Sequence, residues 1–343
     1  MRSITGQFRM WSGWLGAALI VVYGLGMLFL LTVRWLVGER WAVIAFVDTG
    51  LHLPLIPALF LLPLCLIFRR WRLALLLTPP ALLFIVTFLP FFLPQEINIP
   101  SGSLEIRFLT YNLHAEERLL APMSDIIREA DADIVAVQEM STAAAAHLDT
   151  ALADLYPYRA LFPVSSPYHG RGLLSRYPIV TETSWPEEYP IPVRLQRAVV
   201  DVEGNPVVVY NFHAPPSRPI YQGPFDVRPR MAQTRALLDL ARQDTGAVVL
   251  LGDFNTHILD ENYAQLTAEY HDAFWDVGLG FGFTGPDWSH ENSAEGPGWI
   301  PLYQRYDYLF YNDYFLSVAA RVWPESGGSD HRPLLVTLVL VGE

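Results

Sequence analysis

The sequence predicts a protein in two parts: an all-α transmembrane region, followed by an α/β domain built as a four-layered sandwich of two β-sheets flanked by helices. Three observations predict this division. Of the 343 residues, 52% are hydrophobic and 17% are charged, whereas a soluble domain usually has about 25% charged residues. Long uncharged runs are confined to the first hundred residues, and short β-branched runs alternate with helical stretches after Leu104. We therefore expect a transmembrane region at 1–93, a linker at 94–103 and a folded domain at 104–343.

Three apolar stretches make up the transmembrane region. The first, Trp14–Val33, is uncharged and reaches the length of about 20 apolar residues that a helix needs to cross a bilayer. Because the chain after it is also apolar, a membrane anchor fits better than a cleaved signal peptide. The second stretch, Trp41–Phe68, contains Asp48 and three prolines, so we expect it to be kinked; the third is Leu73–Leu93. We expect three spans, or two if the second stretch is re-entrant.

The arginines predict how this region is oriented, because positively charged residues near the spans stay in the cytoplasm. Those before the first span and those between the second and third fall on the same side in a three-span arrangement, whereas the two on the opposite side are offset by Glu39. We therefore expect a multi-pass membrane protein with a cytoplasmic N-terminus and an extracytoplasmic folded domain. The arginines are Arg2, Arg9, Arg34, Arg40, Arg69, Arg70 and Arg72.

The folded domain shows strands that alternate with helices. About 240 residues are ample for a single hydrophobic core. The period-2 and β-branched runs predict strands, and we expect a turn at Gly204-Asn205 between two of them. Two stretches have helical periodicity, Ala121–Ala130 and Pro229–Gln243. The predicted strands are Glu105–Tyr111, Asp133–Val137, Arg197–Val202, Val207–Asn211, Ala247–Leu251, Tyr306–Tyr311 and Leu334–Leu340.

Residue usage and charge exclude several classes of function. All 23 basic residues are arginines, so a P-loop nucleotidase and a Schiff-base enzyme, which need a lysine, are excluded. A single cysteine, Cys65, excludes intramolecular disulfides, cysteine-rich zinc sites and iron–sulfur clusters. Residues 1–100 carry seven arginines against three acidic residues, so the total charge of −12 leaves −16 on residues 101–343. A surface this acidic repels polyanions, which argues against a duplex-DNA binder.

Polar side chains cluster where the predicted strands of this domain begin or end. Strand ends are rigid places on which sites are commonly built. Carboxylate and amide oxygens suit a hard divalent cation, so we expect Mg²⁺, with Mn²⁺ as the alternative. Histidines and further carboxylates suit proton transfer and phosphate charge. The candidate residues are Asn112, Glu139, His213, Asp253, Asn255, Asp307, Asp330 and His331.

Each of these residues, taken singly, also fits a purely structural role. The structural alternatives are a turn for Asn112 and for Asp253–Asn255, a helix cap for Glu139, a satisfied loop histidine for His213, a strand-edge carboxylate for Asp307 and a cap for Asp330-His331. Their joint order along the chain favours chemistry over structure.

That order resembles the motif series of the endonuclease/exonuclease/phosphatase superfamily, which includes pancreatic deoxyribonuclease, abasic-site endonucleases, neutral sphingomyelinases and inositol polyphosphate phosphatases. The resemblance covers about residues 104–341 and implies water attack on a phosphoester with a divalent metal ion. The segments that carry it are Leu109–Leu113, Val137–Glu139, Gly172–Ile179, Asn211–His213, Gly252–Asn255, Arg305–Phe310 and Ser329–Leu334.

The resemblance implies a metal-binding side to the site. Asn112 and Glu139 correspond to the metal-binding end, with Glu139 as the direct ligand, and Asp330 corresponds to a second metal-side carboxylate. One departure concerns Arg171, which stands beside Gly172 where many relatives carry an asparagine. We expect Arg171 to contact a substrate phosphate; a solvated loop arginine is the alternative.

The resemblance also implies the residues that act on the reacting groups. Asp253 corresponds to the residue that positions or deprotonates the attacking water, and Asn255 to one that orients this water or the phosphate. His331, oriented by Asp307, corresponds to the phosphate-side histidine. His213 resembles a second histidine that stabilises the phosphate or the leaving oxygen.

The substrate is less closely defined. An anchored, acidic, extracytoplasmic domain favours a phospholipid or a small phosphoester as substrate, with the lipid bilayer as the other partner. Nucleic acid is not favoured, and the sequence predicts no protein partner. Two alternatives stay open: an extracytoplasmic nuclease, and a non-catalytic membrane binding protein of the same fold.

Overall fold

A computed structural model describes residues 4–93, 95, 97–100, 102–114, 119–164, 170–185, 194–217, 225–287 and 302–342. The chain divides into two compact units, Met1–Leu93 and Pro94–Glu343. Of the expected linker at 94–103, Pro94, Glu96 and Ser101 lie outside the described residues.

The first unit is helical. Two helical segments are long and apolar enough to cross a membrane, Trp14–Arg40 and Trp71–Phe92. Helices α2 (Ala42–Asp48) and α3 (His52–Ile67) pass the same test only as a pair, and they are bent by 60° at a short break. The described residues therefore give two spans, or three if the bent pair is one span. The elements are α1 (Ile4–Val37), η1 (Gly38–Arg40), α2 (Ala42–Asp48), α3 (His52–Ile67), α4 (Trp71–Phe88) and η2 (Leu89–Phe92).

Polar contacts, and a close approach of α1 to α4 at a glycine, hold these helices together. The Arg34 side chain donates from Nε to both carboxylate oxygens of Asp48, at 2.9 and 3.0 Å, and this pairs the end of α1 with the end of α2. The Tyr23 hydroxyl donates to the carbonyl of Pro54 at 2.7 Å. At Gly24, a Cβ atom would lie 2.6 Å from the side chain of Leu76, so glycine allows α1 and α4 to pack closely here.

The second unit contains two six-stranded sheets. Among the described residues the strand order is β11-β12-β1-β2-β4-β3 in the first sheet and β5-β6-β7-β8-β10-β9 in the second. The strands of the first sheet are β1 (Leu104–Asn112), β2 (Ile134–Gln138), β3 (Tyr158–Phe162), β4 (Arg171–Ser175), β11 (Phe315–Val322) and β12 (Leu334–Leu340). Those of the second are β5 (Ile179–Trp185), β6 (Leu195–Val202), β7 (Asn205–His213), β8 (Ala247–Asp253), β9 (His271–Asp272) and β10 (Asp307–Tyr311).

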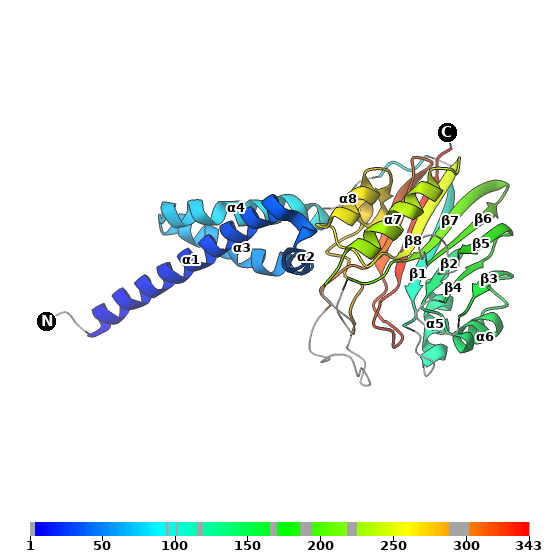
Figure 1. The fold of residues 1–343 in the computed structure, drawn as a ribbon, viewed down its shortest axis with the longest axis horizontal. Coiled ribbons are helices and arrows are strands. Elements are labelled where there is room, and N and C mark those ends of the chain that lie inside the picture. Colours follow the sequence, from blue (N-terminus) through cyan, green and yellow to red (C-terminus); the bar gives the residue numbers. More distant parts are fainter. Residues whose placement is uncertain are drawn as a thin grey trace. The chain divides into compact units, whose positions relative to one another are not determined.

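Helices cover the outer face of each sheet, as Figure 1 shows. One apolar core joins the first sheet to two helices, through residues such as Tyr111 and Ile127. A second core joins the other sheet to its helices, through residues such as Phe254 and Leu237. The helices are α5 (Leu120–Ala130), α6 (Thr142–Ala151), α7 (Arg228–Ala241), α8 (Glu261–Thr267) and the short α9 (Ala273–Val277). The predicted fold class is confirmed: two sheets flanked by helices, preceded in the sequence by an apolar helical region.

Two parallel strand pairs decide which edge of the sandwich carries the polar residues. Strand β1 runs parallel to β2, and β7 runs parallel to β8. Strand β10 runs antiparallel to β8 and pairs Asp307 with Asp253. Carboxyl ends of neighbouring parallel strands meet at one edge of a sheet. The candidate residues therefore lie at the edge where β1, β2, β7 and β8 end and where β10 begins.

The expected elements are present with small shifts of their bounds. The turn between β6 and β7 was placed one residue too late in the sequence: Val202 pairs with Asn205, and the two residues between them, Glu203 and Gly204, both have positive φ. Two successive left-handed residues match the strand twist in a two-residue hairpin. Strands β3, β4, β5, β9 and β11 and helices α6, α8 and α9 were not predicted.

Candidate active site

The amide of Asn112 links the two sheets at the polar edge. Its Nδ2 donates to Glu139 Oε1 at 3.2 Å and to Asp253 Oδ2 at 3.0 Å, so one buried side chain contacts residues of both sheets. Glu139 has a φ of 51°, a left-handed conformation that is costly outside glycine and asparagine. Helix α6 is capped by Ser141, whose hydroxyl accepts from the Ala144 N–H at 3.0 Å. The carboxylate of Glu139 thus faces Asn112, and Ser141, not Glu139, caps α6.

The Asp253 carboxylate is held by the turn that follows β8. Its Oδ1 accepts from the backbone N–H of Asn255 at 2.9 Å, and its Oδ2 accepts from the Asn255 side-chain amide at 3.1 Å. The Asx turn foreseen as a structural alternative is therefore present, together with contacts into the cluster. At Gly252, φ is 141° and a Cβ atom would lie 1.9 Å from the Phe212 carbonyl oxygen, so the strand can approach β7 here only with glycine.

His331 and Asp307 form a buried pair. Asp307 Oδ2 accepts a hydrogen bond from Nδ1 of His331 at 2.8 Å, which leaves Nε2 facing Asp253 Oδ2 at 3.8 Å. The loop before β12 is fixed to β1, because the Ser329 hydroxyl donates to the Asn112 carbonyl at 2.7 Å and accepts from the His331 N–H at 3.0 Å. The ring is therefore held both at its side chain and at its backbone.

Two further histidines belong to the same cluster of polar side chains, which is formed by Asn112, Glu139, Asp253, Asp307, Asp330 and His331. His213 places Nε2 3.5 Å from Glu139 Oε1 and 3.6 Å from Asp253 Oδ2. His114, which the sequence analysis did not select, places Nδ1 3.1 Å from Asp330 Oδ1 and 3.8 Å from Glu139 Oε2. The sequence feature that could have identified His114 is its position two residues after Asn112. The Oδ1 of Asn112 accepts from the His114 N–H at 2.9 Å.

Burial and crowding of carboxylates shift the pKa values in the cluster. Burial, followed by the charge of Asp330, raises the pKa of Glu139 to about 7. Burial also raises the pKa of Asp253 to about 8, with Asp307 and Glu139 adding to the effect and His331 opposing it. Burial would lower the pKa of His331, but the charges of Asp307, Asp253 and Asp330 outweigh it and raise that pKa well above its ordinary value.

The donor set fits a divalent cation. Among the described residues, Glu139 Oε2 and Asp307 Oδ1 are buried oxygens without a hydrogen-bond partner, which is costly unless a ligand satisfies them. Two triads bring possible ligand atoms within 4.8 Å of one another, Glu139–His213–Asp253 and Asp253–Asp307–His331. The triads share Asp253, whereas the expected metal set was Asn112, Glu139 and Asp330. His114 Nδ1 contacts both carboxylates, at 3.8 Å from Glu139 Oε2 and 3.1 Å from Asp330 Oδ1.

Arg171 lies at the same edge, at the start of β4. Its side chain is buried, and its guanidinium donates to the Ser184 hydroxyl at 2.9 and 3.1 Å and to the Trp185 carbonyl. The alternative of a solvated loop arginine is therefore wrong, because these contacts bury the guanidinium against β5. Its contact with a substrate phosphate stays a prediction.

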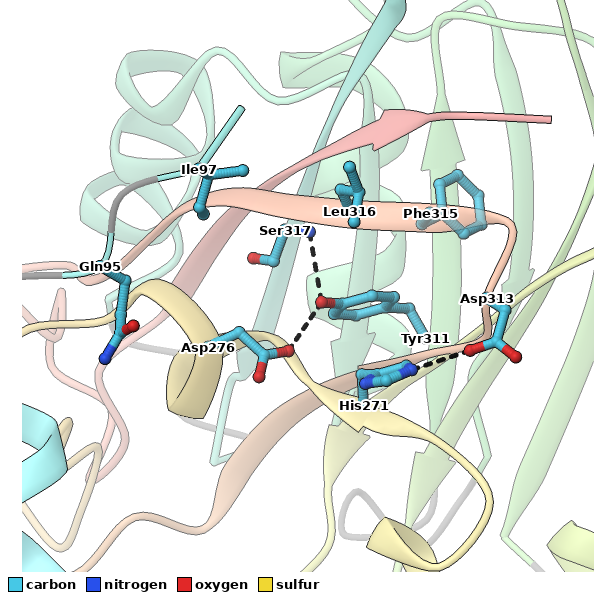
Figure 2. A pocket seen from close by; sticks show the side chains of 9 residues that line it. All are labelled: Gln95, Ile97, His271, Asp276, Tyr311, Asp313, Phe315, Leu316 and Ser317. Carbon is cyan, nitrogen blue, oxygen red and sulfur yellow. Dashed lines mark hydrogen bonds and ion pairs between the residues drawn. The ribbon is translucent and has the colours of Figure 1, made fainter. Parts of the chain in front are cut away.

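A cavity of about 290 Å³ lies away from this cluster. It is at the carboxyl end of β10, beside Tyr311, whereas Asp307 at the start of that strand is in the cluster. Figure 2 shows two pairs of polar side chains at this cavity: Tyr311 donates to Asp276 at 2.6 Å, and His271 contacts Asp313 at 2.9 Å. These side chains are engaged with each other and are separate from the candidate active site.

The fold and the cluster together define a metal-dependent phosphoesterase, because carboxylates and histidines converge at one edge of a two-sheet sandwich. The sequence model described as "Endonuclease/Exonuclease/phosphatase family" matches residues 109–331. The chain belongs to this family. Its members are metal-dependent phosphodiesterases and nucleases, so the chain is a hydrolase of ester bonds that uses a divalent metal.

Solved structures share the fold at low sequence identity. A truncated TDP2 from Caenorhabditis elegans is 20% identical with a TM-score of 0.55, and the match covers 69% of this chain and 98% of that one. An endonuclease/exonuclease/phosphatase from Bacteroides vulgatus is 18% identical with a TM-score of 0.56, over 69% and 99% of the two chains. D. rerio TDP2 complexed with single-strand DNA product is 16% identical with a TM-score of 0.55, over 68% and 98%. The search of curated proteins found no match.

Proposed function

We propose that this chain is a membrane-anchored, Mg²⁺-dependent phosphodiesterase that hydrolyses a phospholipid or another small phosphoester outside the cytoplasm. The observation that carries the proposal is the convergence of Asn112, Glu139, Asp253, Asp307 and His331 at one edge of the sandwich, in a chain that also has apolar helices long enough to span a membrane. The oxygen-rich donor set favours Mg²⁺, with Mn²⁺ as the alternative.

On this proposal, the metal side comprises Asn112, Glu139 and Asp330. When bound, the cation neutralises the charge that develops on the phosphate oxygens. Arg171 contributes a positive charge near the substrate phosphate if the Ser184 contact opens. Oε2 of Glu139 is buried and has no hydrogen-bond partner within the described part of the chain, which supports its role as a direct ligand.

The same proposal assigns the proton transfers to Asp253 and the histidines. Asp253 accepts a proton from water while the water oxygen bonds to phosphorus, and Asn255 keeps the carboxylate oriented. His331, held by Asp307, contacts the phosphate from Nε2. The bond from phosphorus to the leaving oxygen breaks in line, and His213 stabilises that oxygen. A pKa of about 8 for Asp253 supports its role as a base near neutral pH.

Charge supports a substrate with few negative charges. Residues 101–343 carry a net charge of −16. Arg332, next to His331, already pairs with Asp287 at 2.7 Å, and Arg171 is bonded to β5. A nucleic acid needs several cations along its backbone, so a singly charged lipid or small phosphodiester fits better. The second candidate, an extracytoplasmic nuclease, is favoured by the DNA-product complex of the D. rerio relative.

A substrate panel tests this function on the full chain in detergent micelles. The panel contains bis-p-nitrophenyl phosphate, sphingomyelin, phosphoinositides and plasmid DNA, each with Mg²⁺, with Mn²⁺ and with a chelator. We expect metal-dependent release of product from bis-p-nitrophenyl phosphate and from a phospholipid. Fastest turnover of plasmid DNA would favour the nuclease, and no turnover of any substrate would reject the proposal.

Contacts within the first unit support the proposed orientation. Asp48 pairs with Arg34, and Glu39 offsets the charge of Arg40. The segment from the end of α1 to the end of α2 therefore carries no net positive charge. Arg69 and Arg70 lie between α3 and α4, Arg72 lies in the first turn of α4, and all three are exposed. If α2 and α3 formed a re-entrant loop, these three arginines would face the same side as the neutral loop, against the positive-inside rule. Three spans and an extracytoplasmic domain satisfy the rule.

A reporter fused after Glu343 tests the orientation. A reporter that works only in the cytoplasm should be silent there, because three spans place the C-terminus outside. The same reporter fused after Arg70 is the control and should be active. Activity of the C-terminal fusion would overturn the orientation and bring intracellular substrates back into consideration.

His331 and Asp307 should act as one unit in catalysis. The substitutions His331→Ala and Asp307→Ala should each lower the turnover rate, and the double variant should be little slower than the slower single variant, because either change already breaks the pair joined at 2.8 Å. Such non-additivity is expected for residues that share one task. The measurement is kcat on bis-p-nitrophenyl phosphate for the parent and the three variants; log-rate losses that add would show separate roles.

A further inference from the structure

Arg230 is a buried cation next to the candidate active site that no motif of the sequence pointed to. It lies in the first turn of α7, with its side chain only 4% exposed. Its Nη2 donates to Asp260 Oδ2 at 2.7 Å, and its Nη1 donates to the backbone carbonyl of Asn255. One rigid guanidinium therefore joins helix α7 to the turn that follows β8.

The carbonyl that Arg230 holds belongs to a residue with an unusual backbone. Asn255 has a φ of 47°, which asparagine adopts at some cost. In this conformation its N–H and its side-chain amide both point to the Asp253 carboxylate, at 2.9 and 3.1 Å, and the amide also donates to the Ala214 carbonyl at 2.9 Å. A rotation of the Asn255 backbone would break these bonds together.

The other partner of Arg230 is itself fixed. Asp260 is fully buried and caps α8, where its Oδ1 accepts from the Tyr263 N–H at 2.8 Å. Burial alone would raise the pKa of Asp260, but the charges of Arg230 and His257 outweigh it and lower that pKa below its ordinary value. Asp260 thus stays ionised, and the guanidinium is held between an immobile carboxylate and the Asn255 carbonyl.

We propose that Arg230 is a positioning residue for the hydrolytic reaction: it fixes the backbone of Asn255 and, through it, the orientation of the Asp253 carboxylate. This inference rests on the proposed role of Asp253 as the base. A buried ion pair is weak evidence for stability, because an apolar replacement of similar size is often neutral. A planar, two-pronged cation is suited to hold two acceptors at a set angle.

Kinetics of the full chain in detergent micelles with Mg²⁺ and bis-p-nitrophenyl phosphate test the proposal. Arg230→Met keeps a long side chain without the charge. We expect kcat to fall about 10- to 100-fold while KM stays within about twofold, because a small misplacement of a reacting group costs rate. The matched control is Arg197→Met, which breaks the Arg197–Asp244 pair beyond the other end of α7. It should lower the melting temperature and leave kcat unchanged; an equal kcat for Arg230→Met and the parent would overturn the proposal.

Two further variants separate positioning from simple loss of stability. Arg230→Lys can restore the pair with Asp260, but a single ammonium cannot also hold the Asn255 carbonyl at the same angle. We expect its melting temperature to return toward that of the parent while kcat stays low. The double variant of Arg230→Met with Asn255→Ala should be no slower than Asn255→Ala alone, because both act through one turn. Recovery of kcat in the lysine variant, or additive losses in the double variant, would overturn the proposal.

Amide hydrogen exchange gives a readout that does not depend on activity. In Arg230→Met the N–H of Asn255 should exchange faster than in the parent, whereas the N–H groups of β8 should stay protected. The Arg197→Met control should leave Asn255 protected. Unchanged exchange at Asn255 overturns the positioning role, whether or not the parent hydrolyses a phosphodiester; a parent that hydrolyses none rejects the proposed function instead.

Discussion

Replacing Asp253 by asparagine should slow the chemical step of hydrolysis by at least about a hundredfold, the lower end of what removal of a general base costs. The substitution keeps the size of the side chain and removes the group that accepts a proton from water. Substrate binding should be largely retained. The measurement is single-turnover hydrolysis of bis-p-nitrophenyl phosphate at saturating Mg²⁺.

The contacts of Asp253 also predict a modest loss of stability. The two oxygens of its carboxylate accept three hydrogen bonds: Oδ1 from the Asn255 N–H, and Oδ2 from the amides of Asn112 and Asn255. In the asparagine variant one of these oxygens becomes an NH₂ group that cannot accept. An unpaired buried donor costs about 1–3 kcal/mol, so the melting temperature should fall by several degrees.

A control separates the chemical defect from this loss of stability. Asp244→Asn removes a carboxylate that follows α7, outside the candidate active site, where Asp244 pairs with Arg197 and accepts from Tyr210 Oη at 2.5 Å. This variant should lose stability and keep normal hydrolysis. If the Asp253→Asn variant hydrolyses substrate normally, or shows only the unfolding defect, Asp253 is not the base.

The sequence predicted the layers of the fold better than the edges of the sheets. Central strands such as β8 are buried along their whole length and contain a continuous apolar run, here Ala247–Leu251, which is a clear signal. Edge strands carry a weaker one: β5, Ile179–Trp185, has a largely exposed face with Glu182 and threonines, and β9 has only two residues. The one-residue error at the β6–β7 turn arose because Glu203, not Asn205, takes a left-handed conformation there, which no local propensity favours.

The candidate site shows the same limit. The eight polar positions were selected because each flanks a strand and because their order matches a family. The motif order said nothing of His114 or Arg230, since their contacts with Asp330 and Asn255 span 216 and 25 residues of sequence. Arg171 was read as a substrate contact from its place in a motif, and its bonds to Ser184 and Trp185 depend on the pairing of strands that the sequence did not predict. Long-range pairing is what a single sequence leaves open.

Replacing Glu139 by glutamine should remove nearly all turnover. It should also weaken the binding of the divalent cation by about 10- to 100-fold, the loss of affinity that substitutions around a metal site typically cause. The glutamine keeps the shape and one carbonyl oxygen, so the bond from Asn112 to Oε1, at 3.2 Å, can persist. The second oxygen, Oε2, is buried and makes no hydrogen bond among the described residues. Loss of its charge should therefore affect the cation far more than the fold.

The pH dependence of cation binding gives this prediction a second readout. Burial and the charge of Asp330 raise the pKa of Glu139 to about 7 in the metal-free protein, so below this pH the cation competes with a proton for the carboxylate. In the parent, the affinity for Mg²⁺ measured by calorimetry should therefore rise between pH 6 and pH 8, with protons released on binding. In Glu139→Gln this rise should be smaller, with the part that comes from the Asp253 carboxylate remaining, whereas Glu269→Gln, which changes a surface glutamate paired with Arg242, should behave like the parent. A glutamine variant with parental turnover and parental Mg²⁺ affinity at both pH values would show that the ligand lies elsewhere, with Asp253 as the next candidate because both triads contain it.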